Sequence, residues 1–228
     1  MLSIHHDHQR GAVDLGWLKS QHSFSFGSWH HPDYMGVSVL RVINEDRVQA
    51  HTGFGRHAHE NMEILTYVLS GRLTHQDSMG NKGHIKAGEW QLMSAGSGIT
   101  HSEMNDTDET VHFLQIWLYP NVQNAEPSYQ QAYCSPFATP NQWQAIVSPT
   151  QDTPLSIRQH AYVSALALNA GHDSRTAPKL GTSYIHLIEG EVVLNGQTLH
   201  GGDAATLSGP ADIHAVTDSH MIWFDLPQ

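Results

Sequence analysis

Two short pairs of residues in the first half of the chain have the types and spacing of metal ligands. His57 and His59 are two residues apart, and further along His101 and Glu103 are again two apart. Successive side chains of a β-strand point to opposite faces, so on strands each pair would present both donors on one face. Glu63 has the same parity as His57 and His59. Imidazole and carboxylate groups bind divalent first-row metals, so the pattern predicts a metal centre with open positions for substrate or oxygen.

The composition agrees with metal chemistry and excludes several other classes of protein. The 228-residue chain has 19 histidines, 11 Lys+Arg and 22 Asp+Glu, a formal net charge of −11. Such a charge repels nucleic-acid phosphates and anionic lipid headgroups, so we expect neither nucleic-acid nor membrane-surface binding. Because Cys134 is the only cysteine, an intrachain disulfide is excluded. The first residues lack the apolar segment of a secretory signal, so we expect a cytoplasmic protein.

Short apolar runs punctuated by glycine and proline predict an all-β protein. Val, Ile, Leu, Tyr and Trp alternate with polar residues, which is typical of a sandwich or barrel. The predicted strands are residues 36–43, 63–69, 71–76, 90–94, 112–119, 184–188, 191–194, 204–208 and 220–225. A polar, proline-containing stretch, residues 121–140, is predicted to connect a metal-binding domain of residues 1–120 to a second domain of residues 141–228.

A weak internal repeat indicates that the two domains are related barrels. The first half contains YVLSG, AGEWQLMSAG and then His101, and the second contains HLIEG, GGDAATLSG and then His214. This alignment places the following residues opposite the five ligand candidates of the first half, in chain order: Thr176, Pro178, Thr182, His214 and Val216. The second half therefore keeps one histidine at these positions, and we predict that it holds no metal.

Three more polar residues lie between the two ligand pairs, in the run THQDSMGN. His75, Asp77 and Asn81 could belong to a second site, but the composition of residues 78–81 is that of a turn. We interpret the three residues as a turn or as support for the ligands. Two other patterns are set aside, because HENME lacks the second helical histidine of a zinc protease and GSGITH lacks the GK[ST] of a phosphate-binding loop.

The residues around these motifs resemble the pirin family. HxHxxxE and the glycine-framed segment up to Asn105 follow the two cupin motifs, with Ser94 where the second motif normally has proline. The runs WLKSQHSFSF, MGVSVLRVIN, HAHENMEILTYVLSG, HQDSMGN and MSAGSGITHSEMN are similar to pirins, especially bacterial members described as quercetin 2,3-dioxygenase-like. The likeness is looser after about Pro120. It implies a bicupin, two antiparallel double-stranded β-helix (jelly-roll) barrels with the metal in the first.

The resemblance also implies a ligand set. His57, His59, His101 and Glu103 would hold one divalent transition metal, with Fe(II) the expected ion and Cu, Zn, Mn, Ni or Co as alternatives. Many other cupins take their carboxylate ligand from the first motif, which here would be Glu63. Glu63 is therefore expected to support the ligands or to substitute for one of them.

The activity implied by the resemblance is cleavage of a flavonol such as quercetin by O2. The enol hydroxyl and neighbouring ketone of a flavonol, or of another small aromatic enol, could chelate the metal, which would lower the pKa of the hydroxyl. Glu103 is the expected base, with Glu63 second. Residues that could cradle a flat substrate, or equally form a barrel core, are Phe54, Trp90, Met93, Met104, Phe113 and Trp117.

A metal-dependent regulatory or redox-sensing protein is the main alternative, because pirin relatives are also associated with transcription-factor partners. The negative charge would direct such a role to a protein partner rather than to DNA. Isomerisation or oxidation of another small enol is a third possibility. A compact bicupin could function as a monomer.

Overall fold

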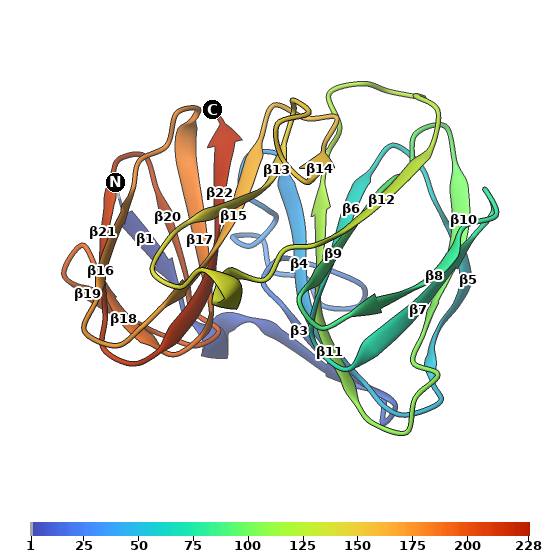
Figure 1. The fold of residues 1–228 in the computed structure, drawn as a ribbon, viewed down its shortest axis with the longest axis horizontal. Coiled ribbons are helices and arrows are strands. Elements are labelled where there is room, and N and C mark those ends of the chain that lie inside the picture. Colours follow the sequence, from blue (N-terminus) through green and yellow to red (C-terminus); the bar gives the residue numbers. More distant parts are fainter. Residues whose placement is uncertain (1) are drawn as a thin grey trace. The chain divides into compact units, whose positions relative to one another are not determined.

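The computed structural model describes residues 2–228, and its regular secondary structure is almost entirely β-strand (Figure 1). These residues divide into two compact units. The N-terminal unit contains Gly11–Tyr133 and Ile157–Gln159, and the C-terminal unit contains the segment that ends at Arg10 together with Cys134–Ser156 and His160–Gln228. No helix among residues 2–228 has the length and apolar character needed to cross a membrane.

The N-terminal unit is made of a seven-stranded and a four-stranded sheet. The larger sheet contains, in spatial order, β12 (Ser128–Tyr133), β9 (Glu89–Ser94), β6 (Glu63–Ser70), β11 (Val111–Leu118), β4 (Leu40–Val48), β3 (Leu18–His22) and β2 (Gly11–Asp14). The smaller sheet contains β5 (Gly53–His59), β10 (Ile99–Met104), β7 (Arg72–Asp77) and β8 (Lys82–Lys86). All of the pairings are antiparallel.

The C-terminal unit likewise has a seven-stranded and a four-stranded sheet, but the last two strands of its larger sheet pair in parallel. Its larger sheet contains β1 (Leu2–His5), β20 (Ala204–Leu207), β17 (Gly181–Glu189), β22 (Ser219–Pro227), β15 (Tyr162–Leu168), β13 (Gln144–Ser148) and β14 (Leu155–Ser156). Its smaller sheet contains β16 (Asp173–Thr176), β21 (Ala211–Ala215), β18 (Glu191–Leu194) and β19 (Gln197–His200). Two short 3-10 helices, η1 (Asp7–Gln9) and η2 (Pro136–Ala138), complete the described elements of this unit. The predicted all-β bicupin fold is confirmed, with jelly-roll sheets that stay open rather than closing into barrels.

The internal repeat is visible in the backbone as well as in the strand order. Gly88 and Gly202 both have left-handed φ values, 82° and 94°. The Gly88 amide donates to the Val68 carbonyl (2.9 Å), and the Gly202 amide donates to the Leu187 carbonyl (2.7 Å). Residues with a Cβ atom rarely adopt this conformation, so glycine recurs at the same turn in both units.

Apolar side chains from both sheets of the N-terminal unit meet between them. Val68 and Phe113 of the larger sheet belong to one buried cluster with Leu73 and Ile85 of the smaller sheet. A second cluster contains Ile64, Met93, Ala95 and Ile99, with Met62 and Trp117 packed against it. Because protein cores are close-packed, these contacts fix the spacing of the sheets and so hold β5, β7 and β10 in place.

The boundaries of the two units differ from the predicted domain limits in two respects. Leu2–His5, predicted to be part of the first domain, forms β1 and pairs with β20 of the C-terminal unit, where Leu2 and Ile4 pack on its apolar cluster. The predicted connector, residues 121–140, contains strand β12, which pairs with β9 of the N-terminal unit. Both strands lie at the edge of a sheet and pair with strands far away in the sequence. Local sequence patterns do not reveal such pairings.

Candidate metal centre

The candidate ligands lie on neighbouring strands of the smaller sheet in the N-terminal unit. His101 of β10 is the register partner of His57 on β5. Burial alternates along β10, so that Ile99, His101 and Glu103 share the buried face. The register shifts between His101 and Glu103, as at a β-bulge, an irregularity that often re-aims side chains beside active sites. The local backbone therefore directs both donor pairs to one side of the sheet.

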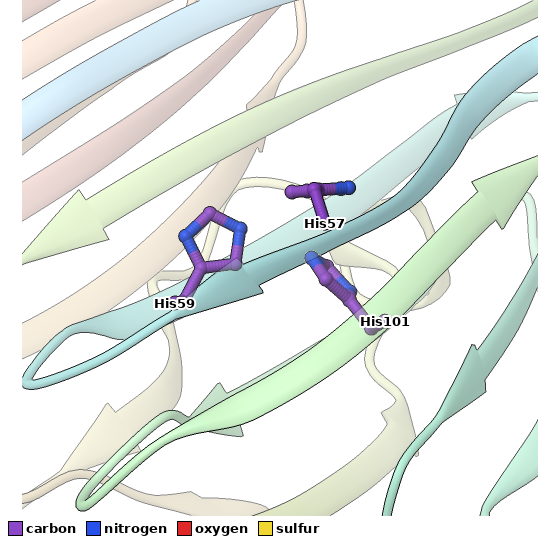
Figure 2. A group of neighbouring side chains, drawn as sticks. All are labelled: His57, His59 and His101. Atoms are coloured by element: carbon purple, nitrogen blue, oxygen red, sulfur yellow. The ribbon is translucent and has the colours of Figure 1, made fainter.

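Three imidazoles converge at this point. One nitrogen from each of His57, His59 and His101 lies within 4.8 Å of the others. Their ring centroids are 4.4–5.0 Å apart, and Figure 2 shows the rings turned toward one another from β5 and β10. His101 is fully buried, whereas His57 and His59 are partly exposed. The arrangement is a half-open triad of nitrogen donors.

The hydrogen bonding of these histidines fits a metal. His57 Nδ1 lies 2.7 Å from the Gly55 carbonyl oxygen. A carbonyl only accepts, so Nδ1 carries the proton and Nε2 keeps its lone pair. Both ring nitrogens of His101 are buried without a hydrogen-bond partner. An unpartnered buried polar group is costly, and coordination of a cation would satisfy it.

Burial also keeps His59 and His101 neutral. It lowers the pKa of His59 to about 4, with further lowering from His101 and His57, which outweigh the opposing effect of Glu103. Burial lowers the pKa of His101 to about 3. The neighbouring His57 and His75 lower it further, against the effect of Asp77. Metals bind the unprotonated imidazole, so at neutral pH both rings are in the form that binds.

Glu103 lies on the inner side of the triad. Its Oε1 accepts from the Thr66 hydroxyl (3.2 Å), and its Oε2 accepts from Gln115 Nε2 (2.7 Å). Gln115 Oε1 in turn accepts from Trp117 Nε1 (3.2 Å), which fixes the orientation of the amide. Glu103 is thus held in place, and its carboxylate groups with His75 and His101 rather than with all three imidazoles.

A cavity of about 410 Å³ opens on the outer side of the triad. His57 and His59 form part of its wall. The other polar lining comes from Ser20, His22, Asn44, Asp46 and Gln115, and the aromatic lining comes from Trp17, Phe26, Phe54 and Trp117. A ligand in this cavity would contact both the aromatic faces and the partly exposed histidines.

Comparison with known proteins agrees with this geometry. The Pirin family profile matches residues 4–118, and a profile of the Quercetinase C-terminal cupin domain matches residues 145–226. A protein of Escherichia coli strain K12 named quercetin 2,3-dioxygenase is 39% identical over 234 residues, covering 100% of this chain and 99% of its own. The chain belongs to the pirin family.

Two further relatives support the assignment to the pirin family. A pirin-like protein of Caulobacter vibrioides is 38% identical over 220 residues, covering 94% of this chain and 95% of its own. The bacterial pirin YhhW of Escherichia coli, solved in complex with nickel(II), has a TM-score of 0.94 at 39% identity, covering 100% of this chain and 99% of its own. Both the fold and the full length of the chain are thus those of bacterial pirins.

Glu63, the second predicted base and substitute ligand, is not brought to the triad. It shares a face of β6 with Leu65 and Tyr67, whereas Thr66, which reaches Glu103, lies on the opposite face. Its Oε2 accepts from the Ser94 hydroxyl (2.8 Å) and from the Arg158 amide (3.2 Å). Burial raises the pKa of Glu63, against the effect of these hydrogen bonds. We therefore withdraw the catalytic role expected for Glu63.

The aromatic lining of the cavity was only partly predicted. Phe54 and Trp117 line it, whereas Trp90 stacks on Tyr67 in the interior, and Phe113 lies in the apolar core. Met93 is also in the core, and Met104 is half-buried away from the cavity lining. Sequence reasoning gave no role to Trp17 and Phe26 or to the polar wall, because these residues come from distant strands and loops.

His22 is buried in the cavity wall. Its Nδ1 lies 2.7 Å from Asn44 Oδ1 and 3.3 Å from the Ser20 hydroxyl. His22 belongs to the run WLKSQHSFSF, which is part of the family resemblance, but the sequence did not show that this run lines a cavity. Pairing of β3 with β4 places His22 opposite Asn44.

The THQDSMGN run forms both a turn and a support. Asp77 Oδ1 accepts from the Met79 and Asn81 amides (2.9 and 3.0 Å), and Asp77 Oδ2 accepts from Asn81 Nδ2 (2.9 Å). The same Oδ2 is 3.1 Å from His75 Nε2. The turn therefore fixes Asp77, and Asp77 fixes the ring of His75 beside His101.

His214 of the C-terminal unit is not the counterpart of His101. Its side chain lies on the exposed face of β21, where Nδ1 is 2.8 Å from Asp173 Oδ1. The buried face of β21 carries Ala211, Ile213 and Ala215. The sequence alignment was displaced along the strand, and a displacement by an odd number of residues exchanges the faces.

Proposed function

We propose that this pirin-family chain is a metal-dependent dioxygenase that cleaves a flavonol such as quercetin with O2. The observation that carries the proposal is the triad of converging histidines at the wall of an aromatic-lined cavity. Its volume, about 410 Å³, is in the range of small-molecule sites. The names of the full-length relatives support the same substrate class. In this proposal the N-terminal unit carries the chemistry, in the cytoplasm.

The proposed metal ligands are His57, His59, His101 and Glu103. When bound there, a divalent transition metal would supply Lewis acidity and redox chemistry with dioxygen. Fe(II) is the proposed ion, and Cu, Zn, Mn, Ni and Co suit the same donors. The nickel complex of a bacterial pirin supports a divalent metal of this series.

The remaining residues of the cavity would bind and orient the substrate. Trp17 and Phe54 are in edge-to-face contact, with centroids 5.4 Å apart, and Trp117 lies edge-on to His59 at 4.9 Å. A flat ring system packed against these faces would exclude water from the histidines. Asn44 and His22 would offer hydrogen bonds to phenolic hydroxyls at the polar wall.

Glu103 is the proposed base for the enol hydroxyl. It is held by Thr66 and Gln115 and lies behind the cavity wall. Gln115 lines the cavity and donates to Glu103, so it links the carboxylate to the cavity wall. Ring opening would then consume one O2 per flavonol and release one carbon monoxide, with both oxygen atoms retained in the products.

Metal loading followed by turnover tests the proposal. The purified protein would be loaded separately with Fe(II), Cu(II), Mn(II), Ni(II) and Co(II), and loss of quercetin followed together with O2 uptake and carbon monoxide release. We expect at least one metal form to exceed the His57→Ala, His59→Ala double variant by about 100-fold or more, in the range of general acid–base and metal effects. If no metal form exceeds the double variant, the dioxygenase proposal fails.

A second variant tests the base. Glu103→Gln keeps the size of the side chain and one carbonyl acceptor but cannot take a proton. We expect it to remain folded by circular dichroism and to lose turnover by about 100-fold or more. Turnover by Glu103→Gln equal to wild type would remove Glu103 from the mechanism and leave the metal triad untouched.

A further inference from the structure

A second group of donors lies behind the triad, on the buried face of β7 and β10. Glu103 is the register partner of His75, and His101 is the register partner of Asp77. One donor atom from each of His75, His101 and Glu103 lies within 4.8 Å of the others. All three side chains are fully buried, and none of them lines the cavity. We call this group the inner triad, and His57, His59 and His101 the outer triad.

His75 is oriented as a metal ligand would be. Its Nε2 lies 3.1 Å from Asp77 Oδ2, and a carboxylate only accepts, so Nε2 carries the proton. The lone pair of Nδ1 then points away from Asp77, and Nδ1 is buried without a hydrogen-bond partner. A carboxylate bound to the far nitrogen is the usual outer partner of a metal-binding histidine. Tyr129 packs against the ring at 4.8 Å and limits its rotation.

The charges around the inner triad favour a cation. Asp77 and Glu103 are both buried, and in residues 2–228 neither forms an ion pair with a lysine or arginine. Buried charges in proteins are normally paired or bound to a metal.

We propose that His75, His101 and Glu103 form an inner position for a divalent first-row metal ion, separate from the outer position. The two positions share His101 and, in the proposed catalytic ligand set, Glu103, so one ion occupies one or the other. An ion at the inner position would have two nitrogen donors and one carboxylate, and would lie apart from the cavity that admits substrate. This inference rests on the proposed function only in taking the outer triad as the catalytic position.

Cobalt titration of three variants tests the inner position. Co(II) absorption bands report the number and type of ligands, so binding to the metal-free protein would be followed by visible absorption and calorimetry. The variants are His57→Ala, His59→Ala; the same double variant with His75→Leu; and the double variant with His84→Ala. His84 is an exposed histidine on β8 and serves as the matched control for surface binding.

We expect the double variant to bind one equivalent of Co(II), more weakly than wild type, and His75→Leu to weaken this binding by a further factor of about 10 or more. His84→Ala should leave the binding of the double variant unchanged. If the double variant binds no more Co(II) than the variant with His75→Leu, the inner position does not exist. His75→Gln, which keeps polarity, should give the same loss if the leucine variant unfolds.

The two proposals fail independently. His75-dependent binding in the double variant, with no flavonol turnover by wild type in any metal form, would support the inner position and reject the dioxygenase. Turnover by wild type without His75-dependent binding would support the dioxygenase and reject the inner position.

Discussion

The two units share the order of their central strands, but the N-terminal unit has buried polar side chains where the C-terminal unit has apolar ones. Through the pairing of β21 with β18, Leu194 lies opposite Ile213, as His75 lies opposite Glu103 through the pairing of β7 with β10. Extending the same register places Ala211 at the position of His101. The C-terminal unit thus has apolar residues at every position of the inner triad, in a cluster of thirteen buried hydrophobic residues.

This comparison separates what the fold requires from what the site requires. The C-terminal unit shows that these strands pack with leucine, alanine and isoleucine between the sheets. Buried polar groups without partners reduce stability, as at both ring nitrogens of His101 and at His75 Nδ1, so these histidines are not there for packing. The difference indicates that the N-terminal unit gives up stability to place metal-binding side chains in its interior. Changes in either unit can test this.

The largest effect is expected from replacing His101 of the N-terminal unit by alanine, the residue at the equivalent position of the C-terminal unit. His101→Ala removes the ligand shared by both triads, so we expect loss of tight metal binding and of turnover in every metal form. Metal content after gel filtration and quercetin turnover measure the two losses. Circular dichroism should show a folded protein, because Ala211 occupies this position in the other unit. A full equivalent of tightly bound metal in this variant would contradict both ligand assignments.

Acid should destabilise the C-terminal unit through His220. Burial lowers the pKa of His220 to about 4 from its usual 6.5, so the unfolded chain takes up the proton first. The contribution of His220 to stability is complete above pH 6.5 and is lost as the pH falls toward 4, by up to about 3 kcal/mol at 1.36 kcal/mol per pKa unit. Urea denaturation at pH 7 and pH 4.5 would measure it. His220→Gln should be less sensitive to this change than wild type, and equal sensitivity would count against the buried neutral form.

A slightly smaller effect is expected from metal on the N-terminal unit. A ligand that binds only the folded state, at about 100 times its Kd, stabilises a protein by about 2.7 kcal/mol. We expect this gain in denaturant unfolding of wild type with Co(II) and none in His101→Ala. If the two units unfold in separate transitions, only the transition of the N-terminal unit should move. A shift of the other transition would place metal in the unit that lacks the ligands.

The smallest effect is expected from His214→Ala. His214 is exposed and its ring pairs with the exposed Asp173, so its loss should change the free energy of unfolding by no more than about 0.5 kcal/mol. Metal content and turnover should equal those of wild type. A loss of metal would restore His214 as the counterpart of His101 and contradict the equivalence of Ala211 with His101.

Local spacing was enough to find the outer triad. His57 and His59 on one strand, and His101 on another, share a face because the side-chain period of a strand is two. The glycines at Gly88 and Gly202 likewise indicated two related units, because the left-handed backbone of these turns favours glycine. The same reasoning failed for His214 and Glu63, since each was assigned by sequence alignment or parity without knowing which face its strand buries.

The sequence by itself determined the strand-rich fold, its duplication and the histidines that converge, because these follow from periodicity and turn chemistry over a few residues. Tertiary structure alone decided the rest. It placed His22 and Asn44 at the cavity, turned Glu63 away, and set His75 beside Glu103. Those outcomes depend on strand pairing between segments far apart in the chain, where a shift of one residue exchanges the buried and exposed faces.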